Sequence, residues 1–244
     1  MENFPGWAPM MERLWPAVSL NLVAATLAWV GRAVSGTGAL VGAGLGVTVY
    51  LTLDWRGYLV FASFVVLGSA VTRWRYPEKA QRGLAQERGG ARGGRHALAN
   101  CALGVGCAVL AWWFDSPALR WAFVGAFAAA LADTVGSELG PLYGRRPILL
   151  PSGRRVPPGT EGAVSGEGTL LGLVAAALLG AEAGLSGLLP LRGIGWIVLA
   201  AGLGSLAESM VAAVGNRRGV SNEALNLLTT LVGAVVAGWG GVGR

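Results

Sequence analysis

The fold class follows from stretches such as 117-PALRWAFVGAFAAALADTVGSE-138, in which an apolar run begins after Arg120 and continues to Asp133. Blocks of roughly 17 to 23 mostly apolar residues recur along the chain, and about 20 residues of helix cross a ~30 Å hydrocarbon layer. Apolar residues make up 53% of the 244 residues and charged residues only 13%, against ~25% in an ordinary soluble domain. So few charges cannot cover a surface in water, and we predict an all-α, polytopic transmembrane helix bundle.

The apolar blocks predict seven or eight spans in a single transmembrane domain over residues 1–244. The predicted helices lie near 14–31, 34–53, 56–72, 97–114, 117–138, 162–180, 193–215 and 222–240. These are eight spans, or seven if the first two or the sixth are misassigned. Two basic loops separate them, at 73–96 and at 141–160, and we expect both loops to be cytoplasmic.

The basic residues gather on one side of the predicted spans. Alternate loops, including Arg32 and the two basic loops, hold 14 of the 19 lysines and arginines. Because positively charged loops stay inside, we expect an integral protein of a bacterial inner membrane with both termini outside and its active site on the cytoplasmic side. This basic face either sets topology and meets membrane lipid headgroups, or holds an anionic substrate such as a nucleotide. No nucleic-acid partner is expected, because no soluble domain presents aromatic residues to bases.

Rare residue types exclude several catalytic classes. Lys79 is the only lysine and Ala80 follows it, so the Gly-Lys-Ser/Thr end of a phosphate-binding loop is absent. His96 is the only histidine, which excludes a zinc site with two histidine ligands. A metal ion in this chain would therefore depend on oxygen ligands.

Three acidic residues fall inside predicted spans at similar depth. Counted from the nearest charged residue or helix start, Asp133, Glu167 and Glu208 all lie in the cytoplasmic half of the membrane. An ionised carboxylate in hydrocarbon costs at least ~2.5 kcal/mol, so each needs a partner or a wet cavity. Shared binding of Mg²⁺ and phosphate explains the cluster best, because Mg²⁺ prefers one or two carboxylates together with substrate phosphates. Proton or ion translocation and purely structural pairing are the alternatives.

The residues around these acids also favour phosphate binding. Ser137 lies one turn from Asp133, and Thr160 is the expected N-cap of a glycine-rich helix start that contains Gly162 and Ser165. Free N–H groups and the positive end of the helix dipole attract phosphate at such a start. Asn222, Glu223 and Asn226 add polar groups at the same side.

At these same stretches the chain resembles the family of integral membrane proteins that includes transmembrane protein 19 and the phytyl-phosphate kinase of plants and cyanobacteria. The similar stretches are 132–140, 156–169, 204–209 and 222–226, with a looser match around Lys79, residues 83–93, Asn100 and Cys101. The resemblance implies phosphoryl transfer from a nucleoside triphosphate, with CTP favoured, to an isoprenoid monophosphate. The product would be a prenyl diphosphate for tocopherol or quinone synthesis.

The residues and the resemblance together predict a Mg²⁺-dependent lipid phosphate kinase. Asp133, Glu167 and Glu208 are the expected metal ligands, with Glu138 and Glu161 as alternates, and the first three together with Arg155 are the expected catalytic residues. Arg155, Lys79 and Arg92 are expected to neutralise triphosphate oxygens. The full predicted nucleotide- and substrate-binding set is Lys79, Arg92, Asn100, Ser137, Glu138, Gly159, Thr160, Glu161, Gly162, Ser165, Asn222, Glu223 and Asn226.

Two alternative functions remain open at this stage. A cytidylyltransferase that makes a CDP-lipid would use much the same site. An ion-coupled transporter would also bury acids, although these acids cluster toward one face rather than at the midplane. Glycine-rich helix faces are compatible with a homodimer, and the sequence does not distinguish prenyl chain lengths or CTP from ATP.

Overall fold

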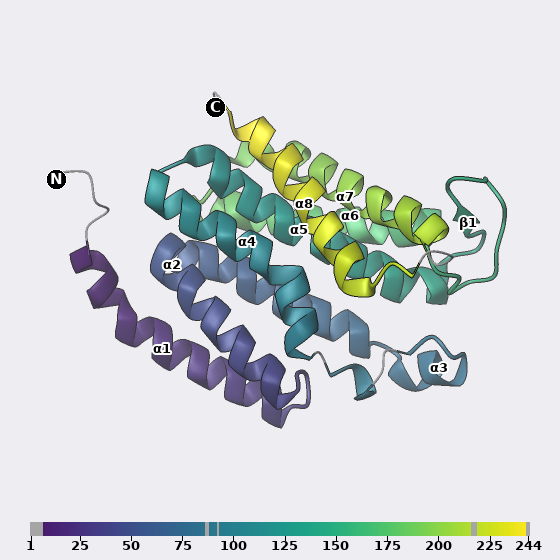
Figure 1. Ribbon diagram of the computed structural model, residues 1–244, viewed down its shortest axis with the longest axis horizontal. Coiled ribbons are helices and arrows are strands. Elements are labelled where there is room, and N and C mark those ends of the chain that lie inside the picture. Colours follow the sequence, from purple (N-terminus) through teal and green to yellow (C-terminus); the bar gives the residue numbers. More distant parts are fainter. Residues whose placement is uncertain (1–6, 86–87, 92, 216–218, 243–244) are drawn as a thin grey trace.

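The protein is a bundle of long helices with very little sheet (Figure 1). The computed structural model describes residues 7–85, 88–91, 93–215 and 219–242. The long helices are α1 (Trp7–Val30), α2 (Gly36–Arg73), α4 (Gly94–Phe114), α5 (Pro117–Tyr143), α6 (Gly166–Leu185), α7 (Ile194–Gly215) and α8 (Asn222–Gly241). The short elements are α3 (Tyr76–Gln81), two 3-10 turns (Arg88–Gly90 and Leu191–Gly193) and the paired strands β1 (Ile148–Leu149) and β2 (Ala163–Val164). The predicted all-α membrane bundle is confirmed.

Seven helices within the described residues are long and apolar enough to cross a membrane, and one of them, α2, is folded back on itself. Its helical geometry breaks at Leu53 and Asp54, where Asp54 has φ 54° and ψ −160°. The rings of Tyr50 and Tyr58, on either side of the break, lie 5.8 Å apart, whereas a straight helix would separate them by about 12 Å. Figure 1 shows the two arms of α2, which correspond to the two spans predicted at 34–53 and 56–72.

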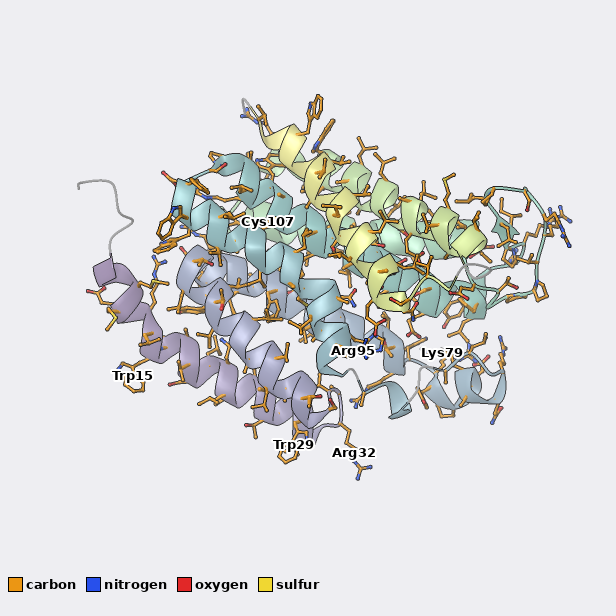
Figure 2. All side chains as sticks on the ribbon, in the orientation of Figure 1. Trp15, Trp29, Arg32, Lys79, Arg95 and Cys107 are labelled. Atoms are coloured by element: carbon orange, nitrogen blue, oxygen red, sulfur yellow. The ribbon has the colours of Figure 1, made fainter. Side chains whose placement is uncertain are left out.

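Helix α5 occupies the centre of the bundle. It packs against α2, α4, α6, α7 and α8, and every residue from Trp121 to Ala132 is buried. Phe127 contacts the rings of Phe61, Phe64 and Phe123 at centroid distances of 5.8, 5.3 and 5.1 Å. Helix α1, in contrast, lies at one edge against α2, and its Trp15 and Trp29 point outward (Figure 2).

Small residues let the other helices approach α5 closely. A Cβ atom added at Gly125 would lie 2.5 Å from the carbonyl oxygen of Gly233 on α8. Gly125→Val is therefore expected to separate α5 from α8 and to lower the free energy of unfolding by about 1–3 kcal/mol. Thermal unfolding in detergent measures this loss. Gly106→Val is the control, because nothing lies within 4 Å of its added Cβ; equal losses in the two variants would contradict the packing argument.

The start of the sixth span differs from the prediction. Helix α6 begins at Gly166, and its N-cap is Ser165, whose Oγ accepts the N–H of Gly168 at 3.2 Å. Thr160 is not the cap, because its hydroxyl donates to the carbonyl of Pro157 at 2.8 Å and closes a turn before β2. Residues 160–165 thus precede the helix and contain the short strand β2.

Candidate active site

A cavity of about 1090 Å³ lies among α4, α5, α6, α7 and α8, at the end of the bundle where α3 and the β1–β2 loop are found. Its lining includes most of the residues predicted from the sequence. They are Asn100, Asp133, Ser137, Gly159, Thr160, Glu161, Gly162, Ser165, Glu208, Asn222, Glu223 and Asn226. These residues come from four helices and one loop that are distant in sequence, so the fold brings them to one place.

Three helices begin at this cavity. The first turns of α4, α6 and α8 contribute Gly94, Ser165 and Asn222 to its lining. Ser221 caps α8 by accepting the N–H of Ala224 at 3.3 Å, whereas α4 follows Gly93, which has no side chain to act as a cap. The positive ends of three helix dipoles therefore meet one space, and this arrangement favours a polyanion.

Two carboxyl groups meet deeper in the same cavity. Asp133 of α5 and Glu208 of α7 both line this cavity close enough to interact, and Glu161 from the loop before β2 also acts on Glu208 electrostatically. Asp133 is ten residues before the end of α5, about 15 Å along the helix. Two carboxylates in contact repel each other unless a proton or a cation lies between them.

The donor set of the cavity suits Mg²⁺. Among described residues the lining holds four acids, Asp133, Glu161, Glu208 and Glu223, against Arg95 and His96 as the basic groups. No group of three or more His, Cys, Asp or Glu side chains in the described part of the chain forms a complete metal cage. Mg²⁺ binds commonly through one or two carboxylates, with phosphates and water completing its shell.

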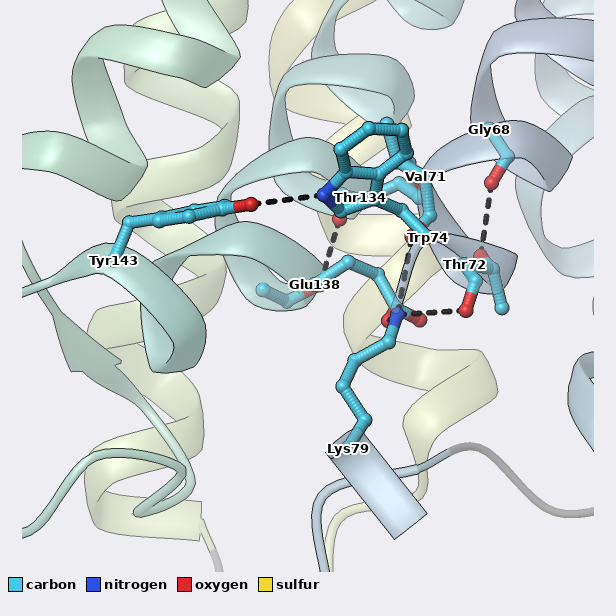
Figure 3. Close-up of polar contacts among 9 residues, drawn as sticks. Gly68, Val71, Thr72, Trp74, Lys79, Thr134, Glu138 and Tyr143 are labelled. Atoms are coloured by element: carbon cyan, nitrogen blue, oxygen red, sulfur yellow. Dashed lines mark hydrogen bonds and ion pairs between the residues drawn. The ribbon is translucent and has the colours of Figure 1, made fainter. Parts of the chain in front are cut away.

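Lys79 and Glu138, both predicted to bind substrate, are instead bound to each other outside the cavity lining (Figure 3). The Lys79 Nζ lies 2.5 Å from Glu138 Oε2 and donates to the carbonyls of Val71 and Thr72 at 3.0 and 2.6 Å. The Lys79 side chain is 1% exposed and that of Glu138 5%. All three ammonium protons have acceptors, so this lysine joins α3 to the ends of α2 and α5 rather than reaching a phosphate.

Two other predicted residues, Glu167 and Arg155, also lie apart from the cavity lining. Glu167 is in the first turn of α6, where its carboxylate accepts the backbone N–H of Arg145 at 3.4 Å. It was expected deeper in the span, but α6 begins later than predicted. Arg155 is exposed in the loop that follows β1, and Arg92 lies outside the described residues.

The structure adds residues that the sequence did not single out. Arg95, in the first turn of α4, lines the cavity with its Nε 3.8 Å from Glu223 Oε1, and Figure 2 shows it at the same end of the bundle as Lys79. Thr134, Ser205 and Ser209 add hydroxyl groups beside Asp133 and Glu208. The position of Arg95 directly after the Gly93-Gly94 helix start is the signal that could have identified it.

Comparison with known proteins agrees with the predicted resemblance. Residues 19–241 match the family described as Integral membrane protein DUF92. The chain belongs to this family. The uncharacterized membrane protein sll0875 of Synechocystis is 36% identical over 198 residues, which are 79% of this chain and 77% of that protein. Protein VTE6, chloroplastic, of Arabidopsis thaliana is 34% identical over 200 residues, 76% of this chain and 60% of the plant protein.

The uncharacterized membrane protein MJ0933 of Methanocaldococcus jannaschii is 30% identical over 231 residues, 92% of each chain. No solved structure matches significantly. The arrangement of the cavity therefore rests on the structure of this chain itself.

Proposed function

We propose that this protein is a kinase of isoprenoid monophosphates, which transfers a phosphoryl group from a nucleoside triphosphate, CTP by preference, to give a prenyl diphosphate. The observation that carries the proposal is the meeting of three helix N-termini and the Asp133–Glu208 pair in one cavity within the membrane bundle. The similarity to the plant protein and the resemblance to phytyl-phosphate kinase support the same chemistry.

The reaction needs little covalent help from the protein. An anionic oxygen of the prenyl phosphate attacks the γ-phosphorus, the bond from that phosphorus to the β–γ bridging oxygen breaks, and the nucleoside diphosphate leaves with those electrons. Because the attacking oxygen is already charged, no general base is required, and catalysis consists of positioning and charge stabilisation. The first turns of α4, α6 and α8 would hold the triphosphate, while Ser137, Asn222 and Asn226 orient phosphate oxygens.

Asp133 and Glu208 are the residues that would hold Mg²⁺, with substrate phosphates and water completing its shell. Bound there, Mg²⁺ would neutralise charge on the β- and γ-phosphates. The excess of acids over basic groups in the described lining supports this role, since a nucleoside triphosphate and a prenyl monophosphate could not share the cavity with four acids without cations.

A product assay tests the proposal. Protein in detergent is incubated with Mg²⁺, CTP and geranylgeranyl phosphate, and the products are separated by mass spectrometry. Prenyl diphosphate together with CDP is the expected result. CDP-prenyl lipid with pyrophosphate would make the protein a cytidylyltransferase instead, and no turnover of any prenyl phosphate would overturn the proposal. ATP replaces CTP in a parallel assay to measure nucleotide preference.

Arg95 is the described arginine best placed to bind the triphosphate. Arg95→Gln is expected to raise the KM for CTP about tenfold, because a charge-assisted hydrogen bond to phosphate contributes about 1.5–3 kcal/mol. Arg82→Gln is the matched control from the same basic loop, since Arg82 pairs with Glu78 and lies outside the cavity lining. A similar change in both variants would indicate a general effect of surface charge instead.

A further inference from the structure

The cavity continues past the polar site into the apolar layer between α6 and α7. Gly172 and Leu173 on α6, and Gly202 and Leu206 on α7, line this part. Leu173 is seven residues after Gly166, the first residue of α6, which places it about 10 Å into the helix. The deep end is thus walled by aliphatic side chains and glycine, in contrast to the acids and helix starts above it.

On either side of this apolar part, the backbones of α5 and α6 and those of α7 and α8 pack closely together. A Cβ added at Gly172 would lie 2.5 Å from the carbonyl oxygen of Ala132 on α5, and one added at Gly204 would lie 2.7 Å from that of Thr229 on α8. Backbones this close leave no passage between α5 and α6 or between α7 and α8. A ligand could not enter at these levels without moving whole helices.

The contact between α6 and α7 is different. Toward the far end of the bundle the two helices are close, because a Cβ added at Gly180 would lie 3.4 Å from Ile197 Cβ. At the level of the cavity, the atom nearest to an added Cβ of Gly202 is Cδ2 of Leu173, at 3.2 Å, the end of a flexible side chain. Leu170, Val174 and Leu203 around this point are 63%, 49% and 42% exposed and would face lipid.

We infer that the opening between α6 and α7 at Leu173 and Gly202 is the lateral entrance through which the isoprenoid chain of the acceptor reaches the site from the membrane. This inference rests on the proposed kinase function and adds to it a route and a determinant of chain length. A phosphate held beside Asp133 and Glu208 leaves its hydrocarbon chain pointing along this apolar part, where Leu173 moves aside. Gly202 leaves the space that the chain occupies.

Gly202→Leu fills that space and tests the inference. For geranylgeranyl phosphate, with twenty carbons, the KM is expected to rise about tenfold or more, because the bound chain loses apolar contact in the filled space. For dimethylallyl phosphate, with five carbons, the KM should stay within about twofold of the native value, because its short chain does not reach Gly202. This retained activity also shows that the variant is folded.

Gly195→Leu is the matched control on the same helix, because nothing lies within 4 Å of a Cβ added there and Gly195 is outside the cavity lining. It should leave both KM values unchanged. An equal effect of Gly202→Leu on both substrates, or no effect on either, would overturn the entrance between α6 and α7 while leaving the kinase function intact.

A second measurement does not depend on turnover. A prenyl monophosphate with a photoreactive diazirine at the end of its chain is bound to the native protein, irradiated, and mapped by mass spectrometry. Labelling is expected on α6 and α7 around Leu173 and Leu206, and Gly202→Leu should reduce it about tenfold, in proportion to the lost affinity. Labelling spread over α1, α4 or α8 would refute the entrance even if the protein proved not to be a kinase.

Discussion

Asp133→Asn is expected to lower kcat for prenyl phosphate phosphorylation by about 10²- to 10³-fold, the range seen when one preorganised electrostatic contact is removed from an active site. The amide keeps the size of the side chain but loses the charge that would hold a cation against the phosphates. Initial rates over a range of Mg²⁺ concentrations measure the effect, and the Mg²⁺ concentration for half-maximal rate should rise as well.

Glu208→Gln should reproduce this loss, and the double variant should lose little more than either single one, because residues that act as one unit are not additive. Asp115→Asn is the control: Asp115 is an exposed acid that pairs with Arg120, away from the cavity. Full activity in Asp133→Asn, or an equal loss in Asp115→Asn, would contradict the role of the pair.

Lys79→Met is expected to lower the free energy of unfolding by about 3–5 kcal/mol, because it leaves the buried carboxylate of Glu138 without its partner. The carbonyls of Val71 and Thr72 lose their donor at the same time. Thermal or denaturant unfolding in a fixed detergent measures the change. The loss should appear even without nucleotide or metal, which separates a structural role from the substrate-binding role that the sequence suggested.

The double variant Lys79→Met, Glu138→Leu should be more stable than Lys79→Met alone, since an apolar pair of similar size replaces a buried ion pair at little cost. Glu78→Gln is the matched control on α3; Glu78 is partly exposed and pairs with Arg75 and Arg82, so its loss should cost at most about 1 kcal/mol. The loss in free energy of unfolding of the double variant should be smaller than the sum of the losses in Lys79→Met and Glu138→Leu. A loss equal to that sum would contradict the explanation.

Most of the fold could be predicted because membrane spans depend on local composition. The apolar block at 117–138 coincides with the buried part of α5, and the break near Asp54 was visible as a charged interruption between two apolar blocks. The start of α6 was placed too early, because Thr160 and Ser165 both precede glycine and an acid within two residues. Either hydroxyl could cap a helix, and the tertiary position of the β1–β2 loop decides between them.

The residues of the candidate site likewise differ in whether their positions could be predicted from local sequence. The rise of 1.5 Å per residue in a helix predicted one depth for Asp133, Glu167 and Glu208. The structure brings Asp133 and Glu208 to the cavity lining but not Glu167, because α6 begins only at Gly166. Lys79 could not be assigned correctly in this way. Its role depends on which way α3 turns after Arg75, a residue with φ 51°, and that turn directs the lysine inward toward Glu138 rather than toward the cavity.

The reversal within α2 also decides to which side of the bundle the cavity opens relative to α1. Because α2 turns back at Asp54, α1 and the two arms of α2 make three crossings before α4. The direction of every later helix depends on that number. Had α2 continued straight, the starts of α4, α6 and α8 would face the opposite side relative to α1. The break at Asp54, a residue with φ 54°, thus sets the side from which a nucleotide would have to reach the proposed kinase site.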